Sequence, residues 1–297
     1  MIKATLSNEI LNYITKIDLN RYKVSEVSLP VAVVSKLRKN SKKKSSYAST
    51  KIEGNPLSEK QVDEVIDSDE QKHYLKPEQE VRNYFLALNY LEEQAAKKEK
   101  FSKKLILDVQ KFVEKGASKE KIGLRGSMPP GVLFAVYDSQ TGSPDYIPPE
   151  YMEIPNLLDE LVEYVNTTDD HPLIIAAIVH YQLVTIHPFE DGNGRTARLL
   201  SGYILDINGY GFNGIGSLEE YFAYDIDEYY ESIQMGLPAL YYSGRENPEI
   251  WINYFLRMVL LYSNKVCELS ESSNNEELEG SLSYLKGNEK EIRKLLK

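Results

Sequence analysis

Apolar residues recur every three or four positions along most of the chain, which is the spacing of helices that bury one face. In residues 78–98, for example, the apolar positions include Val81, Phe85, Leu88 and Leu91. The pattern and its flanking stop signals predict helices over residues 45–53, 78–98, 103–115, 154–165, 173–186, 195–207, 218–226, 227–235 and 251–268. The chain is therefore expected to be mainly helical.

One stretch departs from this spacing. Residues 123–149 are rich in glycine and proline, and they contain an apolar run at 132–137 followed by a turn-rich segment at 138–145. Tyr146 and Ile147 come directly after the turn. Two short apolar runs separated by turn residues predict a β-hairpin.

Candidate chemistry is concentrated in the twelve residues from His187 to Arg198, which join two predicted helices. His187 precedes Pro188, and a residue before proline avoids the helical region, so the imidazole is expected at the exposed C-terminal edge of a helix. A histidine titrates near neutral pH and suits a general base. Asp191 can hold a divalent metal that bridges phosphate oxygens.

The glycine turn and two arginines of this stretch favour binding of a highly charged anion. Gly192 and Gly194 let the backbone approach a ligand closely, and successive N–H groups in such a turn form an anion nest. Arg195 and Arg198 lie in the first turn of the next predicted helix, where the helix dipole favours anions over cations. An anion bound between them would explain this placement. The alternative is a helix–turn–helix corner with surface charges. It does not explain why the histidine, the acidic residue, the glycines and the arginines occur together.

This stretch resembles the signature of Fic-domain proteins, His-Pro-Phe-x-[Asp/Glu]-Gly-Asn-Gly-Arg-x-x-Arg, and every fixed position is met. The resemblance implies an all-α Fic fold with a small β-hairpin flap. It also implies transfer of AMP from ATP to a hydroxyl of a target protein. In that reaction His187 would deprotonate the hydroxyl, and Asp191 would bind Mg²⁺ or Mn²⁺.

The rest of the signature is implied to bind the nucleotide. The glycine turn corresponds to an anion hole for the α- and β-phosphates, Arg195 to a support of the phosphates, and Arg198 to the γ-phosphate ligand. The nucleotide-binding residues expected from the resemblance are Gly192, Asn193, Gly194, Arg195, Thr196, Ala197 and Arg198. Relatives that transfer a phosphate have lysine at the second glycine, which is Gly194 here, so nucleotidyl transfer is favoured.

A second motif lies upstream. Residues 45–53 can form a short helix that Gly54 stops, and Ser49 and Glu53 share one of its faces. The dipole disfavours a carboxylate at a helix C-terminus, so Glu53 is expected to have a cationic partner, with an exposed glutamate as the alternative. Ser49-x-x-x-Glu53-Gly54 resembles the inhibitory motif that many Fic proteins carry before the core, which implies Arg198 as the partner. We therefore expect a self-inhibited protein.

The resemblance also assigns a role to the hairpin. In relatives it forms a flap that holds a segment of the target protein by strand addition. The implied target contacts are Phe134, Val136, Tyr146 and Ile147. A structural hairpin without a partner is the alternative.

Two tyrosines are candidates for the adenine pocket. Relatives have paired tyrosines near the position of Tyr229 and Tyr230, and Tyr230 is the preferred candidate. The chain has 22 tyrosines, so a packing role is the alternative for both. His180 lies on the buried helix seven residues before His187, and we interpret it as a core histidine rather than a ligand.

Three regions are expected along the chain. Residues 1–75 are interpreted as an N-terminal helical region with the inhibitory motif, 76–268 as the Fic catalytic core, and 269–297 as a polar linker and tail. The tail resembles the beginning of a winged-helix module, so the chain is expected to be truncated there. Because relatives often control the inhibitory motif by dimerisation, a homodimer is a candidate assembly.

Composition sets wider limits. The net charge of −10 argues against a dominant nucleic-acid surface. The basic run Lys36 to Lys44 is interpreted as a solvated face, with contact to an acidic partner as the alternative. The single cysteine, Cys267, excludes an internal disulfide and fits a reducing cytoplasm. No stretch is long and apolar enough to span a bilayer, so no membrane association is expected.

Three functions remain open from the sequence. The favoured one is a self-inhibited protein adenylyltransferase acting on a Ser, Thr or Tyr hydroxyl of a target protein, with removal of AMP as a further activity that some relatives have. The second uses the same base to transfer UMP or another phosphate-linked group. The third is a non-enzymatic regulatory module that senses ATP, and the intact His187 and Asp191 count against it.

Overall fold

The protein is described by a computed structural model over residues 7–68, 74–118, 121–137, 142, 144–234 and 248–274. Helices dominate these ranges, and the expected all-α fold is confirmed. In chain order the helices are α1 (Asn8–Glu26), α2 (Val31–Ile52), α3 (Glu59–Asp67), α4 (Lys76–Ala96), α5 (Lys103–Glu114), α6 (Ile154–Thr167), α7 (Pro172–Ile186), α8 (Asn193–Ile207), α9 (Glu219–Phe222), α10 (Ile226–Gln234) and α11 (Glu249–Asn274), with a 3₁₀ turn, η2, at Phe212–Gly214.

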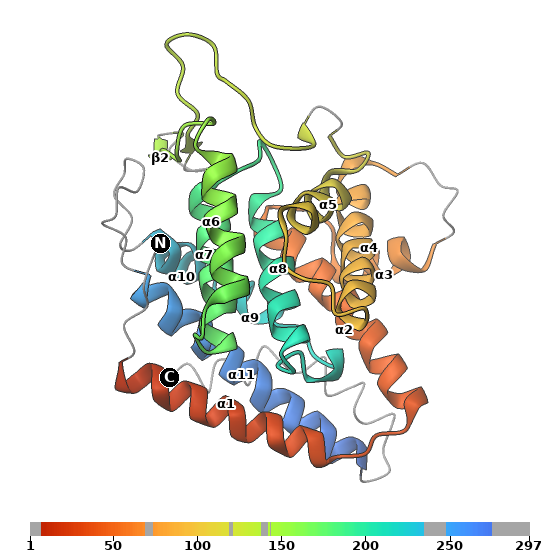
Figure 1. Cartoon of the computed structure of the whole chain (residues 1–297). Helices are drawn as coiled ribbons and strands as arrows, with labels where there is room; N and C mark the ends of the chain where they lie inside the picture. Colours follow the sequence, from red (N-terminus) through yellow and green to blue (C-terminus); the bar gives the residue numbers. More distant parts are fainter. Residues whose placement is uncertain are drawn as a thin grey trace.

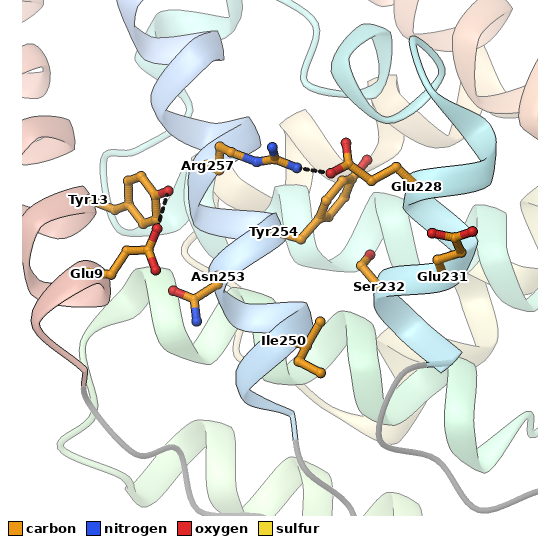
Figure 2. Close-up of a pocket in the computed structure, with 9 residues that line it drawn as sticks. All are labelled: Glu9, Tyr13, Glu228, Glu231, Ser232, Ile250, Asn253, Tyr254 and Arg257. Atoms are coloured by element: carbon orange, nitrogen blue, oxygen red, sulfur yellow. Dashed lines mark hydrogen bonds and ion pairs between the residues drawn. The ribbon is translucent and has the colours of Figure 1, made fainter. Parts of the chain in front are cut away.

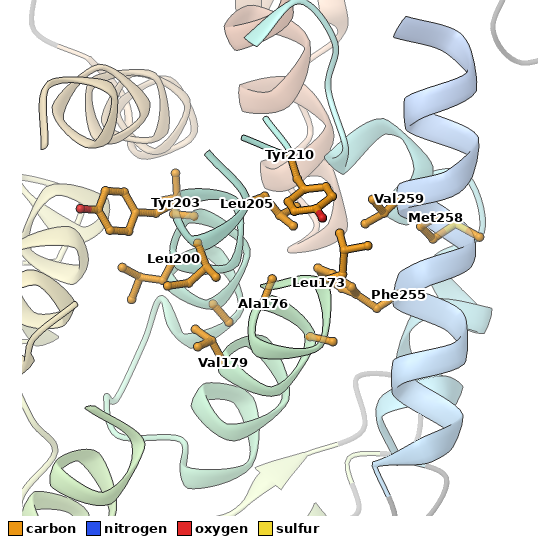
Figure 3. Close-up of a cluster of buried hydrophobic side chains, with 14 of the residues drawn as sticks. Leu173, Ala176, Val179, Leu200, Tyr203, Leu205, Tyr210, Phe255, Met258 and Val259 are labelled. Carbon is orange, nitrogen blue, oxygen red and sulfur yellow. The ribbon is translucent and has the colours of Figure 1, made fainter. Parts of the chain in front are cut away.

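The centre of the fold is the helix pair α7 and α8, which pack side by side with α6, α5, α4 and α11 around them (Figure 1). Nearly every side chain of α7 is buried, as expected for a helix that is apolar on all sides. Leu173, Ala176 and Val179 of α7 lie in one apolar cluster with Leu200 of α8 and Phe255 of α11 (Figure 3). Burying each large aliphatic side chain contributes about 1.5–3 kcal/mol. This core fixes both ends of the loop that joins α7 to α8.

The N-terminal helices pack directly on this core. The α1 helix runs along α11 (Figure 1), and the amide of Asn20 donates to Ser263 Oγ at 2.9 Å and to Asn264 Oδ1 at 2.7 Å. The α2 helix contacts α3, α4, α8 and α9. The segment with the upstream motif is therefore integrated with the helical core.

The α2 helix is longer than expected, because it begins at Val31 rather than near residue 45. Its basic run is more than a solvated face, since several of its lysines pair with carboxylates of this same chain. The pairs are Lys39 and Lys43 with Asp67 of α3, Lys42 with Glu92 of α4, and Lys44 with Glu220 of α9. These ion pairs join α2 to α3, α4 and α9.

The expected hairpin is present but shorter than predicted. Strand β1 (Val136–Tyr137) pairs antiparallel with β2 (Pro144–Tyr146), so Phe134 and Ile147 lie outside the strands. Phe134 packs over the guanidinium of Arg125 instead of extending β1. Residues 138–141 and 143 of the predicted turn lie outside the described residues.

The side chain of Tyr146 is buried, and its hydroxyl donates to the Thr185 carbonyl of α7 at 2.8 Å. Tyr146 therefore anchors the hairpin to the core, and its side chain is not an open contact surface of the kind that the flap interpretation implied.

The last helix also exceeds its predicted length. It continues to Asn274, so residues 269–274 are helical where a linker was expected, because Leu269 and Ser270 are buried against the core. Residues 275–297, which include the predicted start of a winged-helix module, lie outside the described residues. Among the helices of the described ranges, none is long and apolar enough to cross a membrane.

Candidate active site

His187 is the residue that caps the C-terminus of α7. Its backbone is left-handed, with φ 49° and ψ 58°, a region that few residues other than glycine adopt. The ring Nδ1 lies 3.2 Å from the carbonyl oxygen of Val184. A carbonyl can only accept a hydrogen bond, so this contact places the hydrogen on Nδ1 and leaves Nε2 with a lone pair. His187 is therefore oriented as a base through Nε2.

The surroundings of His187 keep its imidazole neutral. Burial and, to a smaller extent, the charge of Arg125 lower its pKa to about 4, although the hydrogen bond to the Val184 carbonyl and the charges of Glu53 and Asp191 oppose this shift. The ring is partly covered by Phe134, whose ring centroid lies 5.9 Å away. The side chain of His187 is half-buried, so the imidazole is less exposed than the sequence predicted, because the segment before β1 packs over part of the ring. At neutral pH the side chain is deprotonated and can accept a proton.

The side chain of Asn193 shapes the loop between the two helices. Its amide nitrogen donates to the Phe189 carbonyl at 2.9 Å, and the Phe189 N–H donates to Asn193 Oδ1 at 3.0 Å. Gly192 has φ +81°, and a Cβ there would lie 2.8 Å from Glu114 Oε1. Only glycine suits this position, which explains the first glycine of the motif.

Arg195 is buried and paired with two carboxylates. Its Nη2 donates to Glu114 Oε1 at 2.9 Å and to Asp191 Oδ1 at 3.1 Å. Burial raises the pKa of Glu114 to about 7, although Arg195 opposes this shift. Sequence reasoning missed Glu114, because it lies on α5, 81 positions before its partner, and belongs to no local pattern.

Arg198 is held by the upstream motif, as the resemblance implied. Its Nε donates to Ser49 Oγ at 2.8 Å, and its Nη2 donates to the Ser49 carbonyl at 3.0 Å and to Glu53 Oε1 at 2.6 Å. Arg198 is 2% exposed, so the arginine end of these bonds is shielded from water, whereas the Glu53 side chain is partly exposed. The two motifs, 145 positions apart, therefore meet in one contact.

The Glu53 carboxylate lies against the first turn of α8. A Cβ added to Gly194 would lie 2.5 Å from Glu53 Oε1 and 3.2 Å from Arg198 Nη1. Helix N-termini attract anions through their unpaired N–H groups and dipole. The carboxylate of Glu53 thus occupies a position suited to an anion.

The two candidate tyrosines have different surroundings. Tyr229 is buried, and its hydroxyl lies 3.1 Å from both Arg198 Nη1 and His180 Nε2. The interpretation of His180 as a core histidine is confirmed, since it is fully buried. Tyr230 is 39% exposed, and its hydroxyl donates to the Ile52 carbonyl at 3.2 Å. Tyr229 thus orients Arg198, while Tyr230 is the more accessible ring.

Two other motif residues face the interior. The side chains of Thr196 and Ala197 are fully buried, and the Thr196 N–H donates to the Gly192 carbonyl at 2.9 Å. Both positions therefore belong to the packing of α8, which differs from the nucleotide contacts that the resemblance implied for them.

Asp191 is the candidate metal ligand, and its surroundings fit a cation. Burial raises its pKa, but Arg195, the Gly192 N–H and Lys121 together lower the pKa below its ordinary value. Lys121 Nζ already lies 3.2 Å from Asp191 Oδ2. The described residues contain no group of three or more His, Cys, Asp or Glu side chains that could hold a metal alone. A single carboxylate fits Mg²⁺, which commonly takes its other ligands from phosphates and water.

A separate pocket of about 340 Å³ lies between α1, α10 and α11 (Figure 2). Two pairs of its polar groups satisfy each other, because Tyr13 donates to Glu9 and Arg257 pairs with Glu228. Among the described residues that line this pocket, none belongs to either motif. The candidate chemistry therefore lies at the motif loop and not here.

Comparison with known proteins agrees with this site. The model of the Fic/DOC family matches residues 100–205. The protein adenylyltransferase Fic of Nematostella vectensis is 42% identical over 69 residues, 22% of this chain and 16% of that protein. The adenylyltransferase fic-1 of Caenorhabditis elegans is 45% identical over 67 residues, 22% of this chain and 13% of that protein. The matched stretch thus spans less than a fifth of the length of these relatives.

Solved structures are similar over most of the chain. A Fic family protein from Desulfovibrio desulfuricans has a TM-score of 0.72 at 22% identity, covering 89% of this chain and 76% of that chain. Fic-1 from C. elegans has a TM-score of 0.68 at 23% identity, covering 89% of this chain and 72% of that chain. The chain therefore has the Fic fold and carries a Fic domain of the Fic/DOC family.

Proposed function

We propose that this protein transfers AMP from ATP to a hydroxyl of a target protein, and that Glu53 restrains this activity. One observation carries the proposal: a carboxylate oxygen of Glu53 lies 2.6 Å from the buried Arg198 and against the first turn of α8, where a phosphate would bind. His187 stands at the other end of the same loop with a free lone pair on Nε2. A base beside an anion site is what nucleotidyl transfer requires.

The chain's own residues would act in the following way. His187 Nε2 accepts the proton of a target hydroxyl, and that oxygen forms a bond to the α-phosphorus of ATP. The bond from the α-phosphorus to the bridging oxygen breaks, and pyrophosphate leaves. The N–H groups at the start of α8 and the guanidinium of Arg198 stabilise the negative charge on the phosphates. Because the imidazole is neutral at pH 7, no prior deprotonation of the base is needed.

Asp191 would hold Mg²⁺ or Mn²⁺ through the carboxylate oxygen that now contacts Lys121. Such an ion would supply positive charge that offsets the charge of the bound phosphates. Lys121 would then move from Asp191 to the solvent or to a phosphate. The low pKa of Asp191 supports this role, since the ligand must be deprotonated.

Glu53 would inhibit by occupying the place of the γ-phosphate. Arg198 donates to both Ser49 and Glu53, so an ATP phosphate must replace the carboxylate before it can reach this arginine. The substrate hydroxyl would come from Ser, Thr or Tyr of a protein segment aligned beside β1. Removal of AMP, with Glu53 orienting a water, is the reverse activity that the same geometry could support.

The adenine base of ATP would bind beside Tyr230, because the ring of this tyrosine is partly exposed next to the end of α2. A cytoplasmic location is proposed because the one cysteine, Cys267, is a buried free thiol. The proposed assembly is a homodimer, and measurement of the mass in solution tests it.

The experiment is transfer of label from α-³²P-ATP in the presence of Mg²⁺, read as self-modification. Three proteins are compared: the natural sequence, Glu53→Gly and Glu53→Gly with His187→Ala. We expect weak labelling of the first, strong labelling of the second and none of the third. Equal labelling of the first two contradicts the inhibitory role, and labelling that survives His187→Ala contradicts the assignment of the base.

A further inference from the structure

Arg125 is a buried arginine that neither motif contains. It lies in the segment between α5 and β1 and is 5% exposed. Its Nε donates to the carbonyl of His187 at 2.8 Å, and its Nη2 donates to the carbonyl of Pro149. Its backbone N–H donates to the Pro188 carbonyl at 2.9 Å. One residue therefore bonds to the backbone of the candidate base, to the residue after it and to the chain that follows β2.

The guanidinium also contacts the segment before β1. Its central carbon lies 4.6 Å from the ring centroid of Phe134, which is the geometry of a cation–π contact. The Phe134 ring lies 5.9 Å from the imidazole of His187. Arg125 thus touches both sides of the hairpin, at Phe134 before β1 and at Pro149 after β2.

Burying this charge is unfavourable in itself. Its guanidinium donates to two backbone carbonyls and lies over an aromatic ring, and burial lowers the pKa of Arg125 although the nearby charge of Glu150 opposes this shift. A buried cation that is balanced by carbonyl dipoles is a costly way to join loops, because apolar residues could pack there instead. The arrangement is explained if the planar guanidinium is needed to hold two backbone carbonyls in a fixed relative position.

One of these carbonyls belongs to His187, whose backbone is strained. His187 adopts a left-handed backbone conformation, and residues in such conformations persist only when their surroundings hold them. The carbonyl of His187 belongs to the peptide unit that leads into Pro188, so holding it restrains the ψ angle of His187 and the backbone from which the imidazole extends. Arg125 binds this carbonyl and the next one along the chain.

We propose that Arg125 is a positioning residue, which holds His187 in its base orientation and couples that orientation to the hairpin. This inference rests on the proposed function, because the orientation matters for proton transfer from a target hydroxyl. A target segment that binds along the hairpin would move Phe134 or Pro149, and Arg125 would transmit the movement to the base. Lysine cannot replace it, since a single ammonium group cannot serve two separated carbonyls with fixed planar geometry.

The test uses Arg125→Lys and Arg125→Met in the Glu53→Gly protein. Misplacing a catalytic group by about 1 Å can lower a rate about 100-fold, so both variants should lose about that factor in kcat for AMP transfer. The KM for ATP should stay within about twofold, because the phosphate site does not use Arg125. Thermal unfolding and ATP affinity, measured on the same samples, report whether the variants fold.

A matched control is Arg82→Met. The guanidinium carbon of Arg82 also lies over an aromatic ring, 5.1 Å from the centroid of Tyr74, and its Nη1 donates to the Tyr74 hydroxyl. Neither contact involves a residue of the two motifs. This variant should keep the kcat of its parent. An equal loss of kcat in Arg82→Met, or an unchanged kcat in both Arg125 variants, would overturn the proposal.

A second readout does not need catalysis. The chain has four histidines, so their imidazole NMR signals can be titrated and His187 assigned by its removal. The charged groups facing His187 are Arg125, Glu53 and Asp191, and Glu53 is absent from every protein in this comparison. Loss of the positive charge in Arg125→Met should raise the pKa of His187, whereas Arg125→Lys should keep it near that of the parent.

The two hypotheses fail in different ways. If the Glu53→Gly parent transfers no AMP, the proposed function fails, and the NMR titration still decides whether Arg125 acts on His187. If the parent is active but the pKa of His187 is the same in Arg125→Met as in the parent, the positioning role is wrong.

Discussion

Replacing Glu53 with glycine should raise the activity of the protein while lowering its stability. The contact that disappears is the 2.6 Å bond between Glu53 Oε1 and Arg198 Nη2. Arg198 keeps its bonds to Ser49 and Tyr229, so its guanidinium stays in place. Removal of the carboxylate should therefore free the anion site without dismantling it.

The magnitude follows from the strength of that bond. A hydrogen bond to a charged group contributes about 1.5–3 kcal/mol, which corresponds to a factor of about 10 to 150 in an equilibrium. The Glu53 side chain is 34% exposed, so the lower part of this range is expected. ATP affinity and the rate of AMP transfer at low ATP should rise by about this factor. The free energy of unfolding should fall by about 1.5 kcal/mol, because the buried Arg198 loses a partly exposed charged partner.

The assay combines calorimetric titration of ATP, the rate of transfer from α-³²P-ATP, and thermal unfolding. Glu220→Gln is the matched control, because it breaks the 2.8 Å ion pair between α2 and α9 and leaves the contacts of Arg198 intact. It should lower stability with no gain in activity. A Glu53→Gly protein whose ATP affinity and rate stay within about twofold of the natural sequence would refute the reasoning.

Three further predictions concern other residues of the site. The pKa of His187 is about 4, so kcat/KM of Glu53→Gly should stay level from pH 8 down to about pH 5 and fall below that; a midpoint near pH 6.5 would contradict the burial argument. Asp191→Asn should remove the preference for Mg²⁺–ATP over ATP in EDTA, measured as the ratio of dissociation constants, and a preserved ratio would exclude Asp191 as the ligand. Glu114→Ala should destabilise the protein by about 3–5 kcal/mol in chemical unfolding, because Arg195 loses a buried partner, and Glu114→Gln should cost less because its amide oxygen can still accept from Arg195; equal losses would contradict this and show that only a charged carboxylate stabilises Arg195.

The sequence predicted those parts of the site that are local in the chain. The loop between α7 and α8 follows from a proline, two glycines and two buried helices, all within a few turns of one another. The contact of Glu53 with Arg198 was expected only through resemblance to a known motif, since no spacing rule relates positions 145 residues apart.

The parts that escaped prediction depend on tertiary packing. Glu114 and Arg125 come from segments with no motif of their own, and each acquires its role from partners more than 60 positions away. The covering of His187 by Phe134 likewise depends on how the segment before β1 folds back. The buried anchor at Tyr146 could not be distinguished from an exposed strand residue by alternation over so short a run.

The most direct test of the central claim compares two labels in one reaction. Glu53→Gly is incubated with Mg²⁺ and either α-³²P-ATP or γ-³²P-ATP, and protein-bound label is measured beside a His187→Ala control. Attack on the α-phosphorus predicts that the α-label is retained on protein, that the γ-label leaves with pyrophosphate, and that the control carries neither. Retention of the γ-label would contradict AMP transfer and show phosphate transfer instead. Absence of both labels, with ATP bound, would contradict the assignment of an enzyme.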